Sequence, residues 1–311
     1  MLGISLIMFI VMHLAPGDPA SMRYGMNPEV SGSARAEFSK MYDLDKPVTV
    51  QYFLWIKRLV KLDFGRSLTN DQPVISRIAS RLPATLILQF ASIILIFCIA
   101  IPLGIYSAVK RNSLFDRVTT VLVFIGYATP AFWLALLLIF FFGVKLQCLP
   151  ISGMSPWYTI YLGTFDKFTD LLRHMVLPVA ATAFGSLAAL SRYSRSSMIE
   201  AMEGNYILTA RAKGLTPKRI ILVHALRNAL LPIITIMGLT LPALISGSFI
   251  FETIFSWPGM GRLGYEAIMN YDYPVVMGVG IIATFLTLIG IFISDVLYAL
   301  VDPRIRLEKH K

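Results

Sequence analysis

The sequence has too few charged residues to cover a soluble domain. Only 15% of its 311 residues are charged, whereas 56% are hydrophobic and 12% are aromatic, and the mean hydropathy is +0.68. An ordinary soluble domain carries about 25% charged and 45–50% apolar residues. A disordered chain is excluded as well, because such chains are polar and poor in aromatic residues. We therefore expect a polytopic membrane protein.

Cysteines and catalytic motifs are equally scarce. Cys98 and Cys148 are the only cysteines, too few for a disulfide-built secreted scaffold. The sequence contains no G-x-x-x-x-G-K-[ST] phosphate loop, and its four histidines are scattered along the chain. We predict no catalytic residue, no cofactor and no metal site in this chain, which also argues against a membrane enzyme.

Long uncharged runs are what the sequence has in abundance. A transmembrane helix needs about 20 mostly apolar residues, and five stretches between consecutive charged residues satisfy this. All are longer and more continuously apolar than barrel strands, which are about 10 residues with an alternating pattern. The stretches lie between Arg81 and Lys110, Arg117 and Lys145, Arg173 and Arg192, Arg227 and Glu252, and Asp272 and Asp295.

The N-terminus supplies a sixth span. Residues 1–17 contain no Asp, Glu, Lys or Arg and end at Pro16-Gly17. A cleaved signal peptide is the rival interpretation, but such a peptide needs a basic region, and no Lys or Arg precedes Asp18. We favour a first transmembrane helix at 1–14, short enough to be truncated, with a true start upstream of Met1.

The loops predict the orientation. With six spans, one set of loops and the tail carries 14 Lys and Arg residues, and the short loops of the other set carry four. The long segment 15–83 lies on the side of those short loops and carries ten more, but it is too long to count in this comparison. Because cytoplasmic loops are enriched in Lys and Arg, the first set is expected to be cytoplasmic, with both termini. This accounts for the net charge of +10 without a nucleic-acid partner. The first set is 108–117, 191–229 and 301–311, and the second is 143–173 and 252–275.

The segment 15–83 is expected to be extracytoplasmic. Within it, 48–62 is amphipathic, with Tyr52, Trp55, Leu59 and Leu62 at helical spacing. We predict a helix that packs on the membrane or on neighbouring spans. A small cap over a pore is the alternative.

The cytoplasmic loop 191–229 is the most informative stretch. Residues from Leu208 to Lys213 are compatible with a helix, and Gly214 is placed to end it in the left-handed conformation. Thr216 and Pro217 can then open a second helix, with Thr216 as cap. The small residues and flanking charges of the first helix indicate a docking site for a partner rather than a solvated connector.

This loop resembles the EAA loop of binding-protein-dependent ABC transporter permeases. Leu208-Thr209-Ala210 replaces the Glu-Ala-Ala of the motif, and His224-Ala225-Leu226-Arg227 replaces Ile-x-Leu-Pro. This departure is typical of the dipeptide, oligopeptide and nickel permease family, and the chain is most similar to its B-type peptide permeases. The positions that match the subfamily pattern are Tyr206, Ala210, Ala212, Lys213, Gly214, His224 and Asn228.

The resemblance extends along nearly the whole chain, in several short motifs that occur in the family's order. These motifs are APGDP at 15–19, LDKP at 44–47, DFG at 63–65, LPAT at 82–85, WPGMGR at 257–262, DYPV at 272–275 and DPR at 302–304.

The resemblance implies an all-α membrane protein with about six transmembrane helices of the type I ABC importer permease fold. Helix 1 would span 1–14, the core permease domain 84–300 and a cytoplasmic tail 301–311. The implied partners are a second homologous permease subunit, two ATP-binding subunits that hold ATP and Mg, an extracytoplasmic substrate-binding protein and membrane lipid. The implied location is a bacterial or archaeal plasma membrane.

The resemblance also implies the site residues and the substrate. The ATPase-coupling loop would consist of Tyr206, Thr209, Ala210, Arg211, Ala212, Lys213 and Gly214. Peptides are the expected substrate, with nickel, glutathione or oligosaccharides as alternatives in the same architecture. A stand-alone secondary transporter is the remoter alternative, although no clear internal repeat is visible.

Two acidic residues of the predicted spans remain. Acids inside a membrane are candidates for function, but Asp295 lies near the end of its span. For Asp295 we favour structural pairing over a role in the pathway. Glu252 is expected to face water at the outer end of the fifth span.

Overall fold

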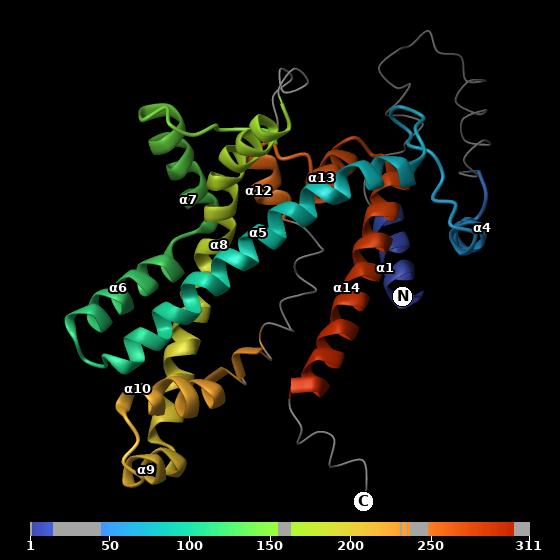
Figure 1. Cartoon of the computed structure of the whole chain (residues 1–311). Helices are drawn as coiled ribbons and strands as arrows, with labels where there is room; N and C mark the ends of the chain where they lie inside the picture. Colours follow the sequence, from blue (N-terminus) through green and yellow to red (C-terminus); the bar gives the residue numbers. More distant parts are fainter. Residues whose placement is uncertain are drawn as a thin grey trace, which may run out of the picture. The chain divides into compact units, whose positions relative to one another are not determined.

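The computed structural model describes residues 2–14, 45–154, 163–230, 232–234, 236 and 248–301. Within these ranges the chain is helical and no named strand forms; an isolated bridge joins Arg66 and Pro73. Figure 1 shows the helices in chain order. They are α1 (Leu2–Leu14), α4 (Val48–Val60), α5 (Val74–Val109), α6 (Leu114–Ala128), α7 (Ala131–Leu138), η1 (Ile139–Lys145), α8 (Thr164–Glu203), α9 (Asn205–Ala212), α10 (Pro217–Arg219), η3 (Ile220–Ala225), α12 (Phe249–Ile254), α13 (Met260–Met269) and α14 (Tyr273–Val301).

Three helices of the described ranges, α5, α8 and α14, are long and apolar enough to cross a membrane. The predicted span between Arg117 and Lys145 is not one straight helix. It consists of α6 and the pair α7–η1, bent by 102°. The break falls at Thr129, which is extended, and Pro130, because a residue before proline is pushed out of the helical region. α1 is a shorter apolar helix, and most of the predicted span between Arg227 and Glu252 lies outside the described residues.

The chain divides into two compact units. The first comprises 1–85, 246–249 and 258–286, and the second comprises 86–245, 250–257 and 287–311.

The first unit contains α1, α4, α13 and the N-terminal parts of α5 and α14. A buried cluster joins the last three through Val74 and Ile78, Met260 and Leu263, and Val275. Helix α5 begins at Val74, before Arg81, where the uncharged run of this predicted span begins.

The amphipathic segment forms α4 and packs against α1. The ring of Phe9 lies 5.2 Å from that of Tyr52 and 6.2 Å from that of Trp55, and the hydroxyls of Ser5 and Tyr52 are 3.0 Å apart. The predicted packing helix is therefore confirmed. It ends at Val60, however, and Leu62 has a positive φ of 59° and is exposed.

The second unit is built around α8, which packs along α6 and α7. Buried residues of α5 and α8 meet at Ala100 and Ala183. Glu252 in α12 corrects an expectation: its side chain is fully buried rather than facing water. Because α12 precedes a tight turn in which the Trp257 N–H donates to the Glu252 carbonyl at 2.7 Å, this residue is folded into the core beside buried Phe255.

Candidate functional site

Helix α9 forms where the loop 191–229 predicted a short helix. It spans Asn205–Ala212 and closes in a Schellman motif, in which two N–H groups satisfy the free carbonyls of the last turn. The Gly214 N–H donates to the Arg211 carbonyl at 2.9 Å, and the Leu215 N–H donates to the Ala210 carbonyl at 3.3 Å. Gly214 has a φ of +73°, in the left-handed region that glycine tolerates best. The predicted glycine turn is confirmed.

A second helix follows the turn, as predicted. α10 starts at Pro217 and continues as the π-helix η3. Thr216 takes the cap position with an extended backbone, but its side chain accepts no cap hydrogen bond.

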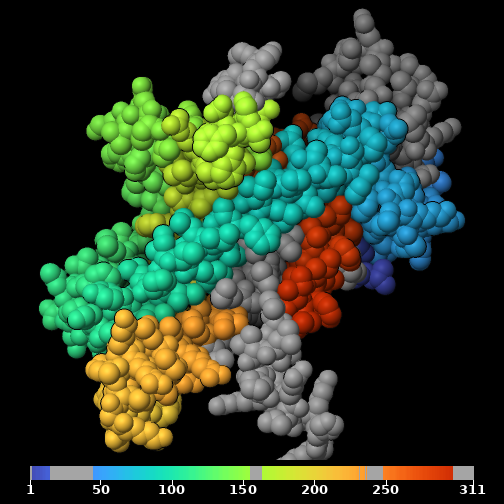
Figure 2. Space-filling view, in the orientation of Figure 1, coloured from blue at the N-terminus to red at the C-terminus, as the bar shows by residue number. Residues whose placement is uncertain are grey.

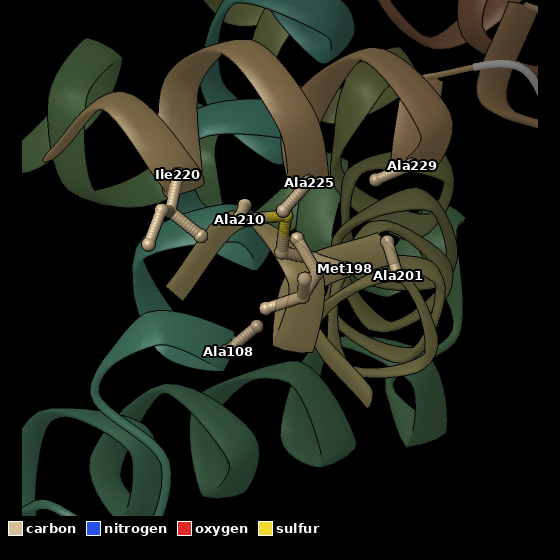
Figure 3. Close-up of a cluster of buried hydrophobic side chains, with 8 residues drawn as sticks. Ala108, Met198, Ala201, Ala210, Ile220, Ala225 and Ala229 are labelled. Atoms are coloured by element: carbon tan, nitrogen blue, oxygen red, sulfur yellow. The ribbon is translucent and has the colours of Figure 1, made fainter. Parts of the chain in front are cut away.

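One face of α9 is anchored to the second unit. Ile207 and Ala210 are 1% and 4% exposed, and both join a buried cluster, drawn in Figure 3. The cluster includes residues from the C-terminal ends of α5 and α8, from η3 and from the helical residues that follow η3, which are Ala108, Met198, Ala201, Ile220, Ala225 and Ala229. The short helix is thus fixed to the ends of two membrane-length helices.

The opposite face of α9 is exposed. Figure 2 shows α9, α10 and η3 as one surface lobe beside the C-terminal end of α5. Leu208 is 60% exposed and points away from the cluster. Sequence reasoning treated Leu208 only as a departure from the motif and missed it as a surface residue. The other exposed positions of α9 and of the turn after it are Asn205, Tyr206, Thr209, Arg211, Ala212, Lys213 and Gly214.

Two predicted site residues hold the helix in place, although Tyr206 is also partly exposed. Ala210 packs into the chain's own cluster, because it lies three residues from Ile207 on the same side of the helix. The hydroxyl of Tyr206 donates to the Ala201 carbonyl at 2.7 Å, which ties α9 to α8. Burial raises the pKa of the Tyr206 phenol, so this donor keeps its proton.

An ion pair braces the same end of this unit. Arg195 donates from Nε and Nη2 to both carboxylate oxygens of Asp116, at 2.6 and 2.8 Å. This is the fork geometry that makes arginine–carboxylate pairs strong. The Ser107 hydroxyl and the Asn112 N–H donate to the same carboxylate. The pair thereby joins α5, α6 and α8 next to Ala108 of the cluster.

The sequence contains part of the signal for this brace. Ser113 and Asp116 have the spacing of a helix start, and the Ser113 hydroxyl accepts from the Asp116 N–H. The partner Arg195 is 79 residues away, and nothing local identifies it.

A close helix crossing lies beside the brace. A Cβ atom placed on Gly104 of α5 would collide with the Ser191 carbonyl of α8 and lie 2.9 Å from the Arg195 backbone nitrogen. Only glycine therefore allows the two backbones to approach this closely.

The predicted pathway or pairing residue is separate from this site. Asp295 lies on α14 and is exposed, and it makes no ion pair with the side chains that the structure describes. Both roles considered for it remain predictions. Among the described residues, no three His, Cys, Asp or Glu side chains gather as a metal site.

Comparison with known proteins gives the family. Residues 100–307 match the family described as "Binding-protein-dependent transport system inner membrane component", and residues 1–89 match the N-terminal component of such membrane proteins.

Full-length relatives agree with the match. The chain is 42% identical to the oligopeptide transport system permease protein AppB of Bacillus subtilis (strain 168) over 98% of its length and 95% of that protein. It is 39% identical to the dipeptide transport system permease protein DppB of Escherichia coli (strain K12), over 99% of this chain and 95% of that protein.

A solved structure supports the fold. A chain of the MetNI methionine ABC transporter, described in inward-facing conformations, aligns with a TM-score of 0.58 at 21% identity, over 73% of this chain and 97% of that chain. The type I importer permease fold is therefore confirmed, and the chain belongs to the family of inner-membrane permease components of binding-protein-dependent transport systems.

Proposed function

We propose that this chain is a permease subunit of an ATP-driven importer of di- and oligopeptides, and that α9 couples it to separate ATPase subunits. The peptide substrate is supported by the relatives, whose names describe oligopeptide, dipeptide and di/tripeptide transport. An external binding protein delivers the peptide, and a second permease subunit completes the membrane pore. Both chain ends lie in the cytoplasm.

The anchored α9 helix is the observation that carries the coupling. Its inner face is locked to the ends of α5 and α8, and its outer face presents an apolar Leu208 beside the basic Arg211 and Lys213. A groove on an ATPase that holds this face would move α9 and both long helices as one body. The ATPase subunits can then shift the permease between two states only if their ATP-bound form binds one state of the permease more tightly than the other.

The test is reconstitution of the chain with its partner subunits, followed by ATP-dependent uptake of a tripeptide such as tri-alanine. Leu208→Asp should abolish co-purification of the ATPase subunits or uncouple hydrolysis from uptake, because a carboxylate would be forced into an apolar contact. Lys61→Glu is the matched control, since Lys61 is exposed in the first unit, and it should leave both unchanged.

A complex that assembles but imports nickel or an oligosaccharide instead of the peptide would overturn the proposal that peptides are the substrate. A chain that imports the peptide without any associated ATPase would overturn the coupling and favour a secondary transporter.

A further inference from the structure

A cavity of about 380 Å³ lies within the second unit between α5 and α8. Small-ligand sites commonly have volumes of about 300–1,000 Å³ and are mostly apolar with a few placed polar groups. Ile93, Ile96, Phe97 and Leu190 give this cavity apolar walls. Its polar lining consists of Gln89, Ser92, Thr182, Ser186 and Tyr193.

The cavity is set in the charge-free stretches of two membrane-length helices. Gln89 and Ser92 come from α5, which has no charged residue between Arg81 and Lys110, and Thr182 comes from α8, between Arg173 and Arg192. Polar side chains in such stretches raise the free energy of the folded protein unless they are hydrogen-bonded, because hydrocarbon offers no hydrogen-bonding partner.

Two of the polar groups make no hydrogen bond within the described protein. Gln89 is only 7% exposed, and its amide makes no hydrogen bond with the described residues. The Thr182 hydroxyl is buried without a partner. Ser92 differs, because its hydroxyl donates to the Leu88 carbonyl of its own helix at 2.8 Å. A buried polar group without a partner destabilises the fold, which applies to the Thr182 hydroxyl. The Gln89 amide lines the cavity and is available to a ligand there.

The larger cavity of the first unit, about 560 Å³, lacks this property. Four of its polar side chains are paired with one another: the His13 ring faces the Gln51 amide at 3.1 Å, and Arg66 pairs with Asp71 at 3.3 Å. These side chains already have partners within the protein, so they do not indicate a ligand in the same way.

We propose that the cavity between α5 and α8 is a station of the peptide pathway, where Gln89 and Thr182 hydrogen-bond a backbone amide of the passing peptide. This rests on the proposed function. A glutamine amide offers one donor group and one acceptor, which matches the C=O and N–H of a peptide group. The apolar walls accommodate side chains of different size.

The uncharged lining also accounts for the substrate range that this station would accept. The described lining has neither a carboxylate nor a guanidinium, so none of these residues would pair with a terminal or side-chain charge of the peptide. Among the same described residues there is no His, Cys, Asp or Glu to hold a metal ion. Binding to the amide alone is weak and sequence-independent, which suits a site that must release what it binds.

The test uses the complete complex in proteoliposomes with tri-alanine as the probe. Gln89→Leu and Thr182→Val remove the hydrogen-bonding groups at similar volume, and each should lower the uptake rate about tenfold, the equivalent of one lost hydrogen bond. Co-purification of the ATPase subunits and the melting temperature should not fall. A merely structural role predicts a lower melting temperature instead.

The matched control is Thr284→Val in α14. It is the same substitution in a membrane-length helix, but the Thr284 hydroxyl donates to the Gly280 carbonyl at 2.7 Å. Its uptake should stay at the wild-type rate.

A second probe tests the amide directly. Replacing the second of the two peptide amides of tri-alanine by an ester removes its N–H, and the resulting loss of uptake should be about tenfold smaller in Gln89→Leu than in wild type. The binding protein is the same in the wild-type and Gln89→Leu complexes, so any preference it has for the amide over the ester cancels when the two losses are compared. Equal losses in wild type and Gln89→Leu, or variants that import tri-alanine at the wild-type rate, would overturn the proposed peptide station. The proposed importer function would still stand. A wild-type complex that assembles and imports no peptide would overturn both.

Discussion

Two buried aspartates organise the two units, and they do so differently. Asp272 lies at the start of α14, with its side chain 1% exposed. It accepts hydrogen bonds from the hydroxyls of Ser67 and Thr69, from the Leu68 N–H at 3.0 Å and from Arg77 at 3.1 Å. All these donors are about 200 residues away in sequence. Three lie in the non-helical residues 67–69 and Arg77 lies in the first turn of α5, so this network ties that segment and the start of α5 to a helix end.

Asp116 also pairs with one arginine, but both of its carboxylate oxygens take part in the fork, and the Ser107 hydroxyl and the Asn112 N–H add to it. Arg195 is 30% exposed, and the pair joins whole helices rather than a loop. The comparison indicates that the first unit fixes a segment in place, whereas the second makes the ends of α5, α6 and α8 one rigid body next to α9. A rigid body of this kind is what a coupling helix needs in order to transmit movement.

The largest effect is expected at Asp272. Asp272→Ala leaves Arg77, whose side chain is 18% exposed, without its partner and removes the acceptor of three other donors, so we expect a loss of about 3–5 kcal/mol in stability. The measurement is thermal unfolding of the purified chain in detergent. Asp71→Ala is the control, because that exposed pair with Arg66 is worth less than about 1 kcal/mol. Similar melting temperatures for the two variants would contradict the claim that the buried Asp272 network stabilises the protein more than the exposed Asp71–Arg66 pair.

Asp116 is expected to rank second. Asp116→Asn keeps the shape but loses the charged fork, and partly exposed Arg195 can turn to water, so the cost is about 1.5–3 kcal/mol. Arg195→Lys should behave similarly because lysine cannot pair bidentately. Both should also lower the uptake achieved per ATP hydrolysed. If both variants kept the wild-type uptake per ATP hydrolysed, the Asp116–Arg195 pair would not be needed to transmit movement from α9 to the long helices.

Gly104→Ala tests the helix crossing beside that brace. The added methyl group meets backbone atoms of α8, which cannot rotate away as a side chain can, so overpacking should cost roughly 1–3 kcal/mol. Thermal unfolding measures the cost. Gly126→Ala is a milder comparison, because the new methyl group would first meet the Phe184 ring at 3.2 Å; an equal loss would argue against backbone contact as the cause.

The smallest effect on stability is expected at Gly214. A Cβ there meets nothing within 4 Å, so Gly214→Ala costs only the left-handed conformation, roughly 1–2 kcal/mol. Gly185 also has open space, but it lies inside α8, so Gly185→Ala should stabilise by about 1 kcal/mol. Opposite shifts in melting temperature are predicted, and shifts of the same sign would contradict the conformational explanation.

The sequence predicts local features well where the local physics is decisive. The uncharged runs identify α5, α8 and α14, and Gly214 with Pro217 identifies the turn after α9. Each depends on residues within one helix or turn.

What the sequence does not predict depends on distant partners. Nothing near Ala210 says that it faces inward, since Ala212 is equally small. Nothing near Asp116 or Asp272 identifies Arg195 or Ser67, and Glu252 was expected in water because acids at span ends usually are. Packing decides these cases, and packing joins positions far apart in the chain.

The central claim is that the exposed face of α9 is where the ATPase subunits engage this chain. The direct measurement is site-specific photo-crosslinking in the assembled complex, with the crosslinking residue in place of Leu208 and, as a control, in place of Lys61. An adduct with an ATPase subunit from position 208 and none from position 61 is the predicted result. A complex that co-purifies with its ATPase subunits yet gives no adduct from position 208 would contradict the account.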